Sequence, residues 1–321
     1  MKALLHFAAS SRLRSRLATI VEPQIVVADE HDEESFAREI ETADVLLHVL
    51  RPVTAAMIAG APRLKLIQKI GVGVNTIDCE AAERACIAVA NMPGTNTPAV
   101  AEHTLALMLS TLRRIAAFDS VVRNGSGWHL APDSMEALGE IHGASVGLVG
   151  YGAVARYLVP ILEALGANVR FWNRTPRPQA SATQTTLDQL LATSDIVSLH
   201  IPLTPDTTHF LDRRSLEQMK RSAIVINTAR GQLIDQAALE EFLRAGRLAG
   251  AGLDVFEDEP IPAGHLELLA SCPTVVMTPH IAWLTPATLE RSLSVIQENC
   301  RRLRDGEPLL HQIAPKRKTD I

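Results

Sequence analysis

Long apolar runs are missing from this sequence. No window of 18 consecutive apolar residues occurs among its 321 positions, although 47% of them are apolar. A membrane-spanning helix needs about 20 such residues, so we expect no membrane partner. A strong charge of one sign is missing too, because the formal net charge is −5 and acidic and basic residues are interspersed. This balance argues against nucleic acid or an anionic membrane surface as the main partner.

Cysteine is scarce. The four cysteines, Cys79, Cys86, Cys272 and Cys300, are scattered without the spacing of a metal site. We therefore predict no bound metal, reduced thiols and a cytoplasmic location. The apolar run at residues 1–9 is interrupted by His6, and arginines follow it instead of preceding it. This pattern favours a first β-strand over a signal peptide.

Repeats and low-complexity linkers are also missing, and short apolar strands alternate with helical patterns throughout. This alternation predicts an α/β fold with parallel sheets, and the length is about right for two domains. A helix is predicted to open at Thr97-Pro98 and to end in Arg113-Arg114, before an irregular stretch at 123–144. The expected strands are 2–6, 24–28, 45–49, 65–69, 87–90, one starting at Ser145, 168–172, 196–200, 223–227, 250–254 and 274–278.

The last predicted helix, roughly 285–304, has no sheet of its own, so we expect it to return to the first domain. The predicted domains are therefore a discontinuous substrate-binding domain, 1–98 plus 285–321, and a dinucleotide-binding domain, 99–284.

A glycine-rich motif opens the second series of strands. Gly150-Tyr151-Gly152-Ala153-Val154-Ala155 fits the pattern G-x-G-x-x-G/A and lies between a predicted strand and a predicted helix. In this context the motif predicts a pyrophosphate site, in which Gly150 makes the tight turn and Gly152 lets the ligand approach the backbone. The helix N-terminus supplies N–H groups for the anion. The alternative is an ordinary strand–turn–helix.

The choice of cofactor depends on a position about 20 residues further along, where an acid binds the ribose of NAD. Asn173 stands there, followed by Arg174 and Thr175. A carboxylate repels the 2′-phosphate of NADP, whereas an amide, a guanidinium and a hydroxyl can each donate to it. The segment therefore predicts a preference for NADP, with NAD possible. The alternative is a solvated basic turn.

Three strands in the second half are each followed by one side chain capable of ionic chemistry: Arg230, Glu259 and His280. Ligands bind at the carboxyl ends of strands in open α/β sheets, so we expect these side chains to gather there. A guanidinium matches a carboxylate, and imidazole exchanges protons near neutral pH. We predict that Arg230 binds a 2-ketoacid, His280 transfers its proton, and Glu259 bonds the far nitrogen of His280. The alternatives are a surface arginine and a solvated acidic loop.

Two other segments are candidates for the same site. Asp254 is predicted either to orient the nicotinamide amide or simply to end its strand. In Lys69-Ile70-Gly71-Val72-Gly73, glycines let backbone N–H groups point at an anion. Val72 and Gly73 are therefore predicted to hold the substrate carboxylate across the cleft from Arg230. The alternative is a plain glycine turn.

Together these segments resemble the D-isomer-specific 2-hydroxyacid dehydrogenase family over nearly the whole chain. The resemblance extends to Ala101-Glu102-His103-Thr104-Leu105-Ala106-Leu107 and Val197-Ser198-Leu199-His200-Ile201-Pro202-Leu203-Thr204. It implies two Rossmann/flavodoxin-like domains with the active site in the cleft between them, and a homodimer formed through residues near 99–145. It also implies that Arg230, Glu259 and His280 are the catalytic residues.

The resemblance implies further site residues. Ala153 and Val154 fall on the pyrophosphate loop of the family, and Pro202 and Thr207 fall on its cofactor-lining loop. On the nicotinamide side lie Thr228, Arg230, Asp254 and His280. Trp283 stands where many members carry a small residue, which places it in the predicted substrate pocket.

The combination Asn173-Arg174 is similar to that of NADPH-dependent glyoxylate/hydroxypyruvate reductases. The sequence therefore predicts an enzyme that reduces a small 2-ketoacid of the glyoxylate or hydroxypyruvate type to the D-2-hydroxyacid with NADPH. Two alternatives stay open. One is an NAD-dependent D-2-hydroxyacid dehydrogenase with a different substrate range, and the other is a cofactor-sensing scaffold resembling the corepressors of this family.

Overall fold

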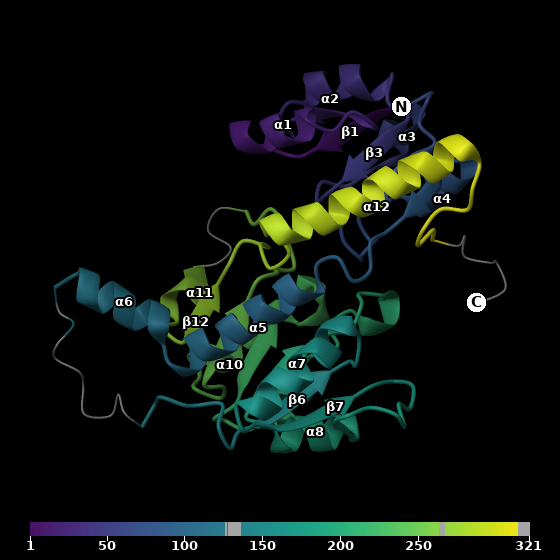
Figure 1. Cartoon of the computed structure of the whole chain (residues 1–321). Helices are drawn as coiled ribbons and strands as arrows, with labels where there is room; N and C mark the ends of the chain where they lie inside the picture. Colours follow the sequence, from purple (N-terminus) through teal and green to yellow (C-terminus); the bar gives the residue numbers. More distant parts are fainter. Residues whose placement is uncertain (126, 128–135, 263–266, 314–321) are drawn as a thin grey trace. The chain divides into compact units, whose positions relative to one another are not determined.

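The computed structural model describes residues 1–125, 127, 136–262 and 267–313. The chain forms two compact units, which we call unit 1 (Met1–Asn96 with Thr285–Ile321) and unit 2 (Thr97–Leu284) (Figure 1). Each unit contains one sheet whose paired strands all run parallel. The predicted α/β class with two parallel sheets is therefore confirmed.

The sheet of unit 1 has five strands. Their order is β2 (Gln24–Ala28), β1 (Lys2–His6), β3 (Val45–His48), β4 (Leu66–Lys69) and β5 (Ala88–Ala90). Leu4, Leu46 and Ile67 lie side by side in register and face one core. Successive side chains of a strand point to opposite faces, so both faces of these apolar strands are buried.

The first four helices of unit 1 begin at side chains that cap them. Ser10, Asp32, Thr54 and Asp78 each accept a hydrogen bond from the backbone N–H three residues further on. Such caps satisfy N–H groups that have no partner inside the helix. The helices are α1 (Ser11–Ala18), α2 (Glu33–Ile40), α3 (Ala55–Ala59) and α4 (Cys79–Arg84).

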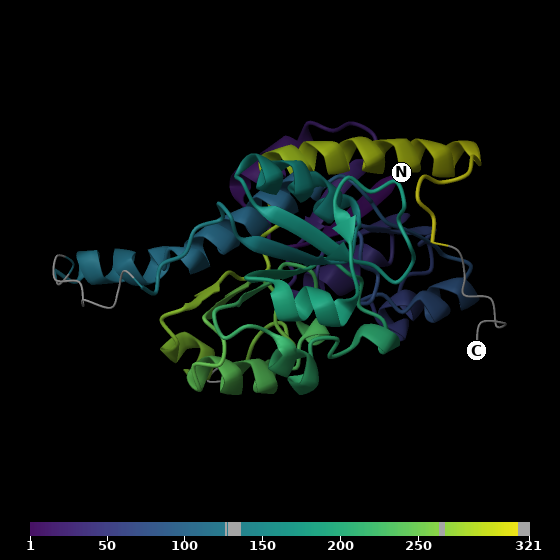
Figure 2. The same cartoon turned by 90° about the horizontal axis from the view of Figure 1, so that it is seen from below.

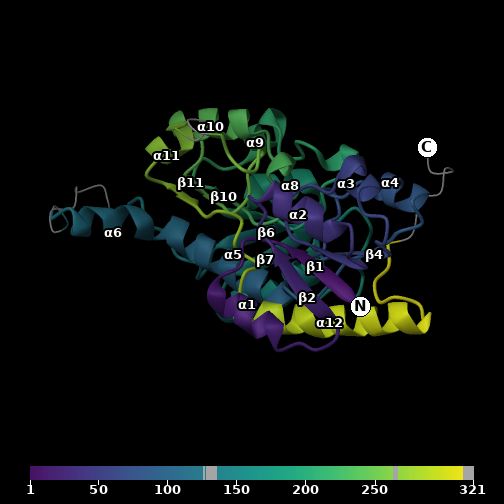
Figure 3. The ribbon, with the colours of Figure 1, turned by 90° about the horizontal axis from the view of Figure 1, so that it is seen from above.

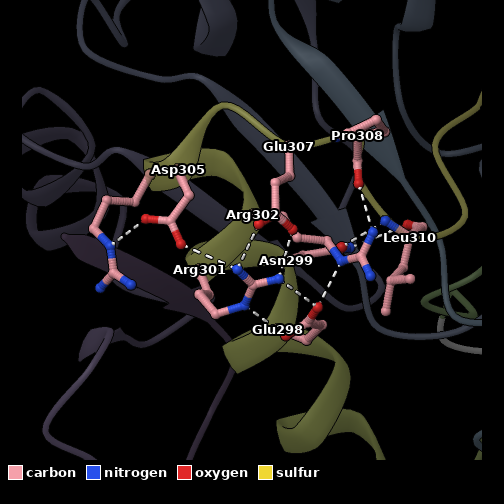
Figure 4. Close-up of polar contacts among 9 residues, drawn as sticks. Glu298, Asn299, Arg301, Arg302, Asp305, Glu307, Pro308 and Leu310 are labelled. Atoms are coloured by element: carbon pink, nitrogen blue, oxygen red, sulfur yellow. Dashed lines mark hydrogen bonds and ion pairs between the residues drawn. The ribbon is translucent and has the colours of Figure 1, made fainter.

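The long helix α12 (Pro286–Asp305) closes unit 1 and ends at Gly306, whose φ is 71°. Its last turns hold the segment that follows. Arg301 pairs with Glu298, Asp305 and Glu307, as Figure 4 shows. Gln312 then forms an antiparallel bridge with Ala90. Residues 307–313 therefore cover the outer edge of β5, which would otherwise present unpaired backbone groups.

The sheet of unit 2 has seven strands, several of which lie side by side in Figure 2. Their order is β12 (Val275–Met277), β11 (Gly250–Leu253), β10 (Ile224–Asn227), β9 (Ile196–Leu199), β6 (Ser145–Val149), β7 (Asn168–Trp172) and β8 (Thr183–Gln184). β8 is a two-residue strand that the sequence did not predict, because so short a run shows no periodicity.

Helices cover both faces of this sheet. Ile224 and Ile226 pack with α5 (Thr97–Leu112) and α7 (Ala153–Ala164). Val225 points the other way, into a core shared with α8 (Leu187–Thr193), α9 (Arg213–Gln218) and α10 (Gln236–Arg244). The short helix α11 (Glu267–Ser271) follows. None of the helices described is long and apolar enough to cross a bilayer.

Helix α6 of unit 2 departs from the sequence prediction. The sequence suggested a helix up to Arg114, but Arg114 adopts a left-handed conformation and α6 (Ile115–Arg123) begins after it. None of the residues of α6 is buried. In Figures 1 and 3 this helix extends away from the sheet of unit 2. Helix prediction relied on an apolar stripe that faces a core, and α6 packs on no such core.

Candidate active site

The carboxyl ends of the strands in unit 2 form one edge that carries the predicted site residues. The last residues of neighbouring strands are paired in register from Trp172 through Val149, Leu199, Asn227 and Leu253 to Met277. The glycine motif, Asn173, Arg230, Asp254 and His280 all follow these ends. Parallel topology therefore brings together segments that lie more than 100 positions apart in the sequence.

The glycine motif has the geometry of an anion cradle. Gly150 has a φ of 100°, and a Cβ there would lie 2.6 Å from the carbonyl oxygen of His200. At Gly152 the nearest protein atom to such a Cβ is 3.9 Å away, so the protein leaves this space open. Gly152 begins α7 without a side-chain cap, and within the described residues the N–H groups of Ala153 and Val154 have no acceptor. A dinucleotide pyrophosphate fits these features.

The turn after β7 is held by the side chain of Asn173. Its Oδ1 accepts from the N–H of Tyr151 at 3.3 Å, and its Nδ2 donates to the carbonyl of Thr175 at 2.7 Å. Gln184 of β8 donates to the backbone oxygen of Asn173 at 3.0 Å. Asn173 thus acts first as a scaffold for the turn. Arg174 is exposed beside it.

His280 and Glu259 form a short pair. Nδ1 of His280 lies 2.6 Å from Oε2 of Glu259, as the sequence suggested. The other carboxylate oxygen of Glu259 accepts from the N–H of Phe256 at 2.9 Å, which fixes the carboxylate. The imidazole is 19% exposed, and within the described residues its Nε2 has no partner. The ring therefore presents one nitrogen to a ligand while the other is anchored.

Arg230 stands at the end of a tight turn after β10. Asn227 shapes this turn, since its side chain donates to the carbonyl of Arg230 at 2.8 Å and accepts from the N–H of Ala229 at 3.0 Å. Burial lowers the pKa of Arg230, while the Glu259 carboxylate acts in the opposite direction. A guanidinium keeps its charge in proteins. Sequence reasoning missed the role of Asn227, although asparagine at a strand end is typical of such turns.

Asp254 is fully buried and holds the loop that carries His280. Its oxygens accept from the N–H groups of Ile281 and Ala282, both at 2.9 Å, and from the hydroxyl of Thr278 at 2.6 Å. Burial alone raises the pKa of Asp254, but hydrogen bonds from His103, Thr278 and the backbone lower it below the usual value. The sequence offered two roles for Asp254, and the structure adds this third one.

His103 supports the same loop from α5. Its Nε2 lies 2.9 Å from Oγ1 of Thr278 and 3.5 Å from Asp254. Trp283 donates its indole N–H to the carbonyl of His280 at 3.1 Å. The strained backbone of His280, with a φ of 54°, is thus surrounded by hydrogen bonds. No sequence pattern linked His103 to this loop, because α5 and β12 meet only in the folded chain.

The remaining predicted cofactor residues of unit 2 are engaged in local contacts. The hydroxyl of Thr207 donates to the carbonyl of Pro202 at 2.8 Å and helps to cap the short helix η2 (Pro205–Thr207). The hydroxyl of Thr228 lies 2.8 Å from that of Thr104. These contacts shape the edge of the sheet, and the contact of Pro202, Thr207 and Thr228 with cofactor stays a prediction.

The predicted residues of unit 1 lie in the loop after β4. Val72 is exposed, and Gly73 is partly exposed. Within the described residues, the backbone N–H groups of Val72 and Gly73 have no acceptor. Two neighbouring free N–H groups suit an anion. As for metals, no group of three His, Cys, Asp or Glu side chains in the described part of the chain could hold an ion.

Comparison with known proteins decides the family. The sequence pattern described as "D-isomer specific 2-hydroxyacid dehydrogenase, NAD binding domain" matches residues 105–282. A glyoxylate reductase of Korarchaeum cryptofilum is 35% identical over 84% of this chain and 82% of its own length. The chain belongs to the D-isomer specific 2-hydroxyacid dehydrogenases.

Solved structures agree with this assignment. The TT0316 protein of Thermus thermophilus has a TM-score of 0.85 and 35% identity, over 98% of this chain and all of its own. An acyclic imino acid reductase in complex with NADPH and D-Arg has a TM-score of 0.83 and 29% identity, over 98% of this chain and all of its own. As a member of the 2-hydroxyacid dehydrogenases, the protein is an oxidoreductase that uses a nicotinamide cofactor.

Proposed function

We propose that this dehydrogenase reduces a small 2-ketoacid of the glyoxylate or hydroxypyruvate type to the D-2-hydroxyacid, with NADPH as the preferred cofactor. The observation that carries the proposal is the Glu259–His280 pair, with Nε2 of His280 available and Arg230 in the same set of strand ends. The glyoxylate reductase from Korarchaeum cryptofilum, similar over most of the chain, supports the substrate class.

Each of the three residues has a defined task in this reaction. Arg230 binds the substrate carboxylate with its planar fork. In unit 1, Val72 and Gly73 offer their backbone N–H groups to a substrate carboxylate. His280 donates the proton from Nε2 to the carbonyl oxygen as that oxygen gains charge. Glu259 stabilises the protonated imidazole through Nδ1 and keeps the ring oriented. Bound cofactor supplies the hydride. Trp283 borders the substrate side chain.

The preference for NADPH is supported by charge at the turn after β7. Asn173 holds this turn without adding a negative charge, and the exposed Arg174, Thr175 and Arg177 follow it. A 2′-phosphate there meets donors and no carboxylate. The imino acid reductase of similar fold was solved with NADPH. NAD remains a second, weaker cofactor in this proposal.

A panel of 2-ketoacids, each assayed with NADPH and with NADH, tests the proposal. We expect the highest kcat/KM for glyoxylate or hydroxypyruvate with NADPH, and a D-configured product from hydroxypyruvate. Larger ketoacids used faster than both would refute the substrate class. A protein that binds NADPH but reduces none of the panel would instead fit the cofactor-sensing scaffold.

We further propose that the protein forms a homodimer through the apolar surface of α6. Ile115 and Val122 are 53% and 54% exposed, and they border a groove together with Phe118 and Leu138. Exposed apolar surface of this kind marks an association site. Light scattering after size-exclusion chromatography should show a dimer for the wild type and a monomer for Ile115→Glu/Val122→Glu. The cytoplasmic location stays a prediction.

A further inference from the structure

We infer that Asn91 is a positioning residue that orients the substrate-binding loop Gly71-Val72-Gly73. The inference rests on the proposed function, in which the N–H groups of Val72 and Gly73 hold the substrate carboxylate. Asn91 directly follows β5, and its Nδ2 donates to the carbonyl oxygen of Val72 at 2.9 Å. Every contact in the argument lies within unit 1.

Two peptide planes of the loop are fixed by the same neighbouring segment. The carbonyl of Gly71 accepts from the backbone N–H of Met92 at 2.8 Å, and the carbonyl of Val72 accepts from Asn91. A trans peptide is planar, with its C=O and N–H pointing in opposite directions. The N–H of Val72 shares a plane with the first carbonyl, and the N–H of Gly73 shares a plane with the second. Both N–H groups are therefore directed away from residues 91–92.

Only one of these two planes is held by a side chain. The Met92 contact is made by backbone and survives any substitution that leaves the chain path intact. The Asn91 contact depends on the amide alone. Gly71 has a φ of 129°, and glycine has more backbone freedom than any other residue. The loop can therefore reorient at its first residue. Without the amide, the Val72–Gly73 peptide loses the bond that keeps the N–H of Gly73 aimed at an anion.

Asn91 is itself held by a chain of buried amides. Nε2 of Gln68 donates to the backbone oxygens of Ala90 and Asn91, at 3.2 Å and 3.4 Å. Nδ2 of Asn299 donates to Oε1 of Gln68 at 2.6 Å. Gln68 and Asn299 are both completely buried. Leaving a buried amide without a hydrogen-bond partner costs free energy, so these linked hydrogen bonds leave the backbone at Asn91 little freedom.

The chain of amides continues to the C-terminal segment of unit 1. Leu310 donates its N–H to Oδ1 of Asn299 at 2.7 Å, and its carbonyl accepts from Nδ2 at 3.1 Å. Arg302 fixes the same segment by donating to the carbonyl of Pro308 at 2.9 Å, as Figure 4 shows. The N–H of Asn91 donates to the carbonyl of His311 at 3.2 Å. Residues 307–313 therefore form the outer support of the substrate loop.

Asn91→Ala tests the inference, with Asn168→Ala as the matched control. Asn168 also donates its amide to a glycine-segment carbonyl, that of Gly143, but in unit 2. We expect Asn91→Ala to raise KM for the ketoacid and the inhibition constant of oxalate by roughly tenfold, the equivalent of about 1.4 kcal/mol. We expect kcat to change less than threefold, and the dissociation constant of NADPH and the melting temperature to stay close to wild type. Asn91→Asp should weaken oxalate binding further, because its carboxylate not only lacks the donor but also repels the Val72 carbonyl oxygen and the bound anion.

The NMR order parameter of the Gly73 backbone amide gives a readout that does not need turnover, because it reports how firmly this peptide plane is held. It should fall in Asn91→Ala and stay unchanged in Asn168→Ala. Unchanged oxalate binding with an unchanged order parameter would overturn the inference, and so would a parallel loss of NADPH affinity. If the wild type neither reduces a ketoacid nor binds oxalate, the proposed function fails, and the role of Asn91 is then decided by the order parameter alone.

Discussion

Histidines occupy the carboxyl edges of both sheets, but the two edges give them opposite environments. In unit 1, His6 and His48 end neighbouring strands in register and are only 3% and 1% exposed. In unit 2, His280 lies just beyond β12 with Nδ1 on a carboxylate and Nε2 accessible. The topological position is similar, and the difference lies in burial and in the charge opposite the ring.

Burial decides the protonation of the histidines in unit 1. It is the largest cause that lowers the pKa of His6 to about 4, and Arg51 adds to it. Burial, followed by the charge of Lys69, lowers the pKa of His48 to about 3. Both rings are therefore neutral near pH 7 and cannot serve as proton donors. A strand end therefore only positions a histidine. Whether that histidine can transfer a proton depends on its exposure to a ligand and on a nearby carboxylate such as Glu259.

The largest expected effect is on kcat when the accessible His280, and not the buried His48, is replaced. His280→Gln should lower kcat by about 10²–10⁴-fold, the usual contribution of general acid–base catalysis. His48→Gln is the matched control, because glutamine can still donate to the carbonyl of Arg51 that His48 contacts at 2.9 Å. Its kcat should stay within a few-fold of wild type. Steady-state kinetics of both variants measures this difference. A similar loss of kcat in the two variants would contradict the distinction between the two histidines.

Substitution of Arg230, the residue proposed to bind the substrate carboxylate, is expected to give the next largest effect. Arg230→Lys keeps the positive charge but loses the parallel pair of hydrogen bonds, so kcat/KM should fall by roughly 10–100-fold. The wild type should barely reduce ketones that lack a carboxylate. Rapid turnover of a neutral ketone, or a lysine variant with wild-type kcat/KM, would remove Arg230 from this role.

Acid should destabilise unit 1 more than unit 2. A histidine whose pKa is lowered on folding contributes its full stability above pH 6.5 and loses it as the pH falls towards the folded value. At pH 5 each such ring costs about 2 kcal/mol. Among the residues that the structure describes, unit 1 has two such rings, His6 and His48, whereas unit 2 has one, His200, whose pKa burial lowers to about 4.

Hydrogen exchange of peptides from each unit, compared at pH 7 and pH 5 after correction for intrinsic rates, measures this difference. In His48→Gln the loss in unit 1 should shrink by about half, because one of its two rings is gone, and its excess over the loss in unit 2 should disappear. Equal losses in the two units of the wild type would contradict the burial argument.

The smallest expected effect concerns the cofactor. Arg174→Ala should raise KM for NADPH about tenfold, or about 1.4 kcal/mol, and leave KM for NADH nearly unchanged. Asn173→Asp should add repulsion to the 2′-phosphate and improve the use of NADH. The ratio of kcat/KM for the two cofactors decides the matter. A wild type that prefers NADH would mean that this turn is only a solvated basic loop.

Much of the fold was accessible from local patterns. The strand ranges were predicted to within a residue or so, because most of these strands are short apolar runs, and several, such as β3, β9 and β10, are buried on both faces. The helix over Ala153–Ala164 followed from the glycine motif before it. Prediction failed at α6 and at β8, where no burial pattern exists to detect.

The sequence by itself determined which side chains follow the strand ends of unit 2, since parallel strands place their carboxyl ends on one edge. Only the tertiary structure decided how those side chains are held. Asp254 and His103 meet at Thr278, and Asn91 reaches the carbonyl of Val72. The physical reason is that periodicity reports burial, which is a property of neighbouring residues. A buried hydrogen bond instead depends on the exact approach of groups that the sequence leaves far apart.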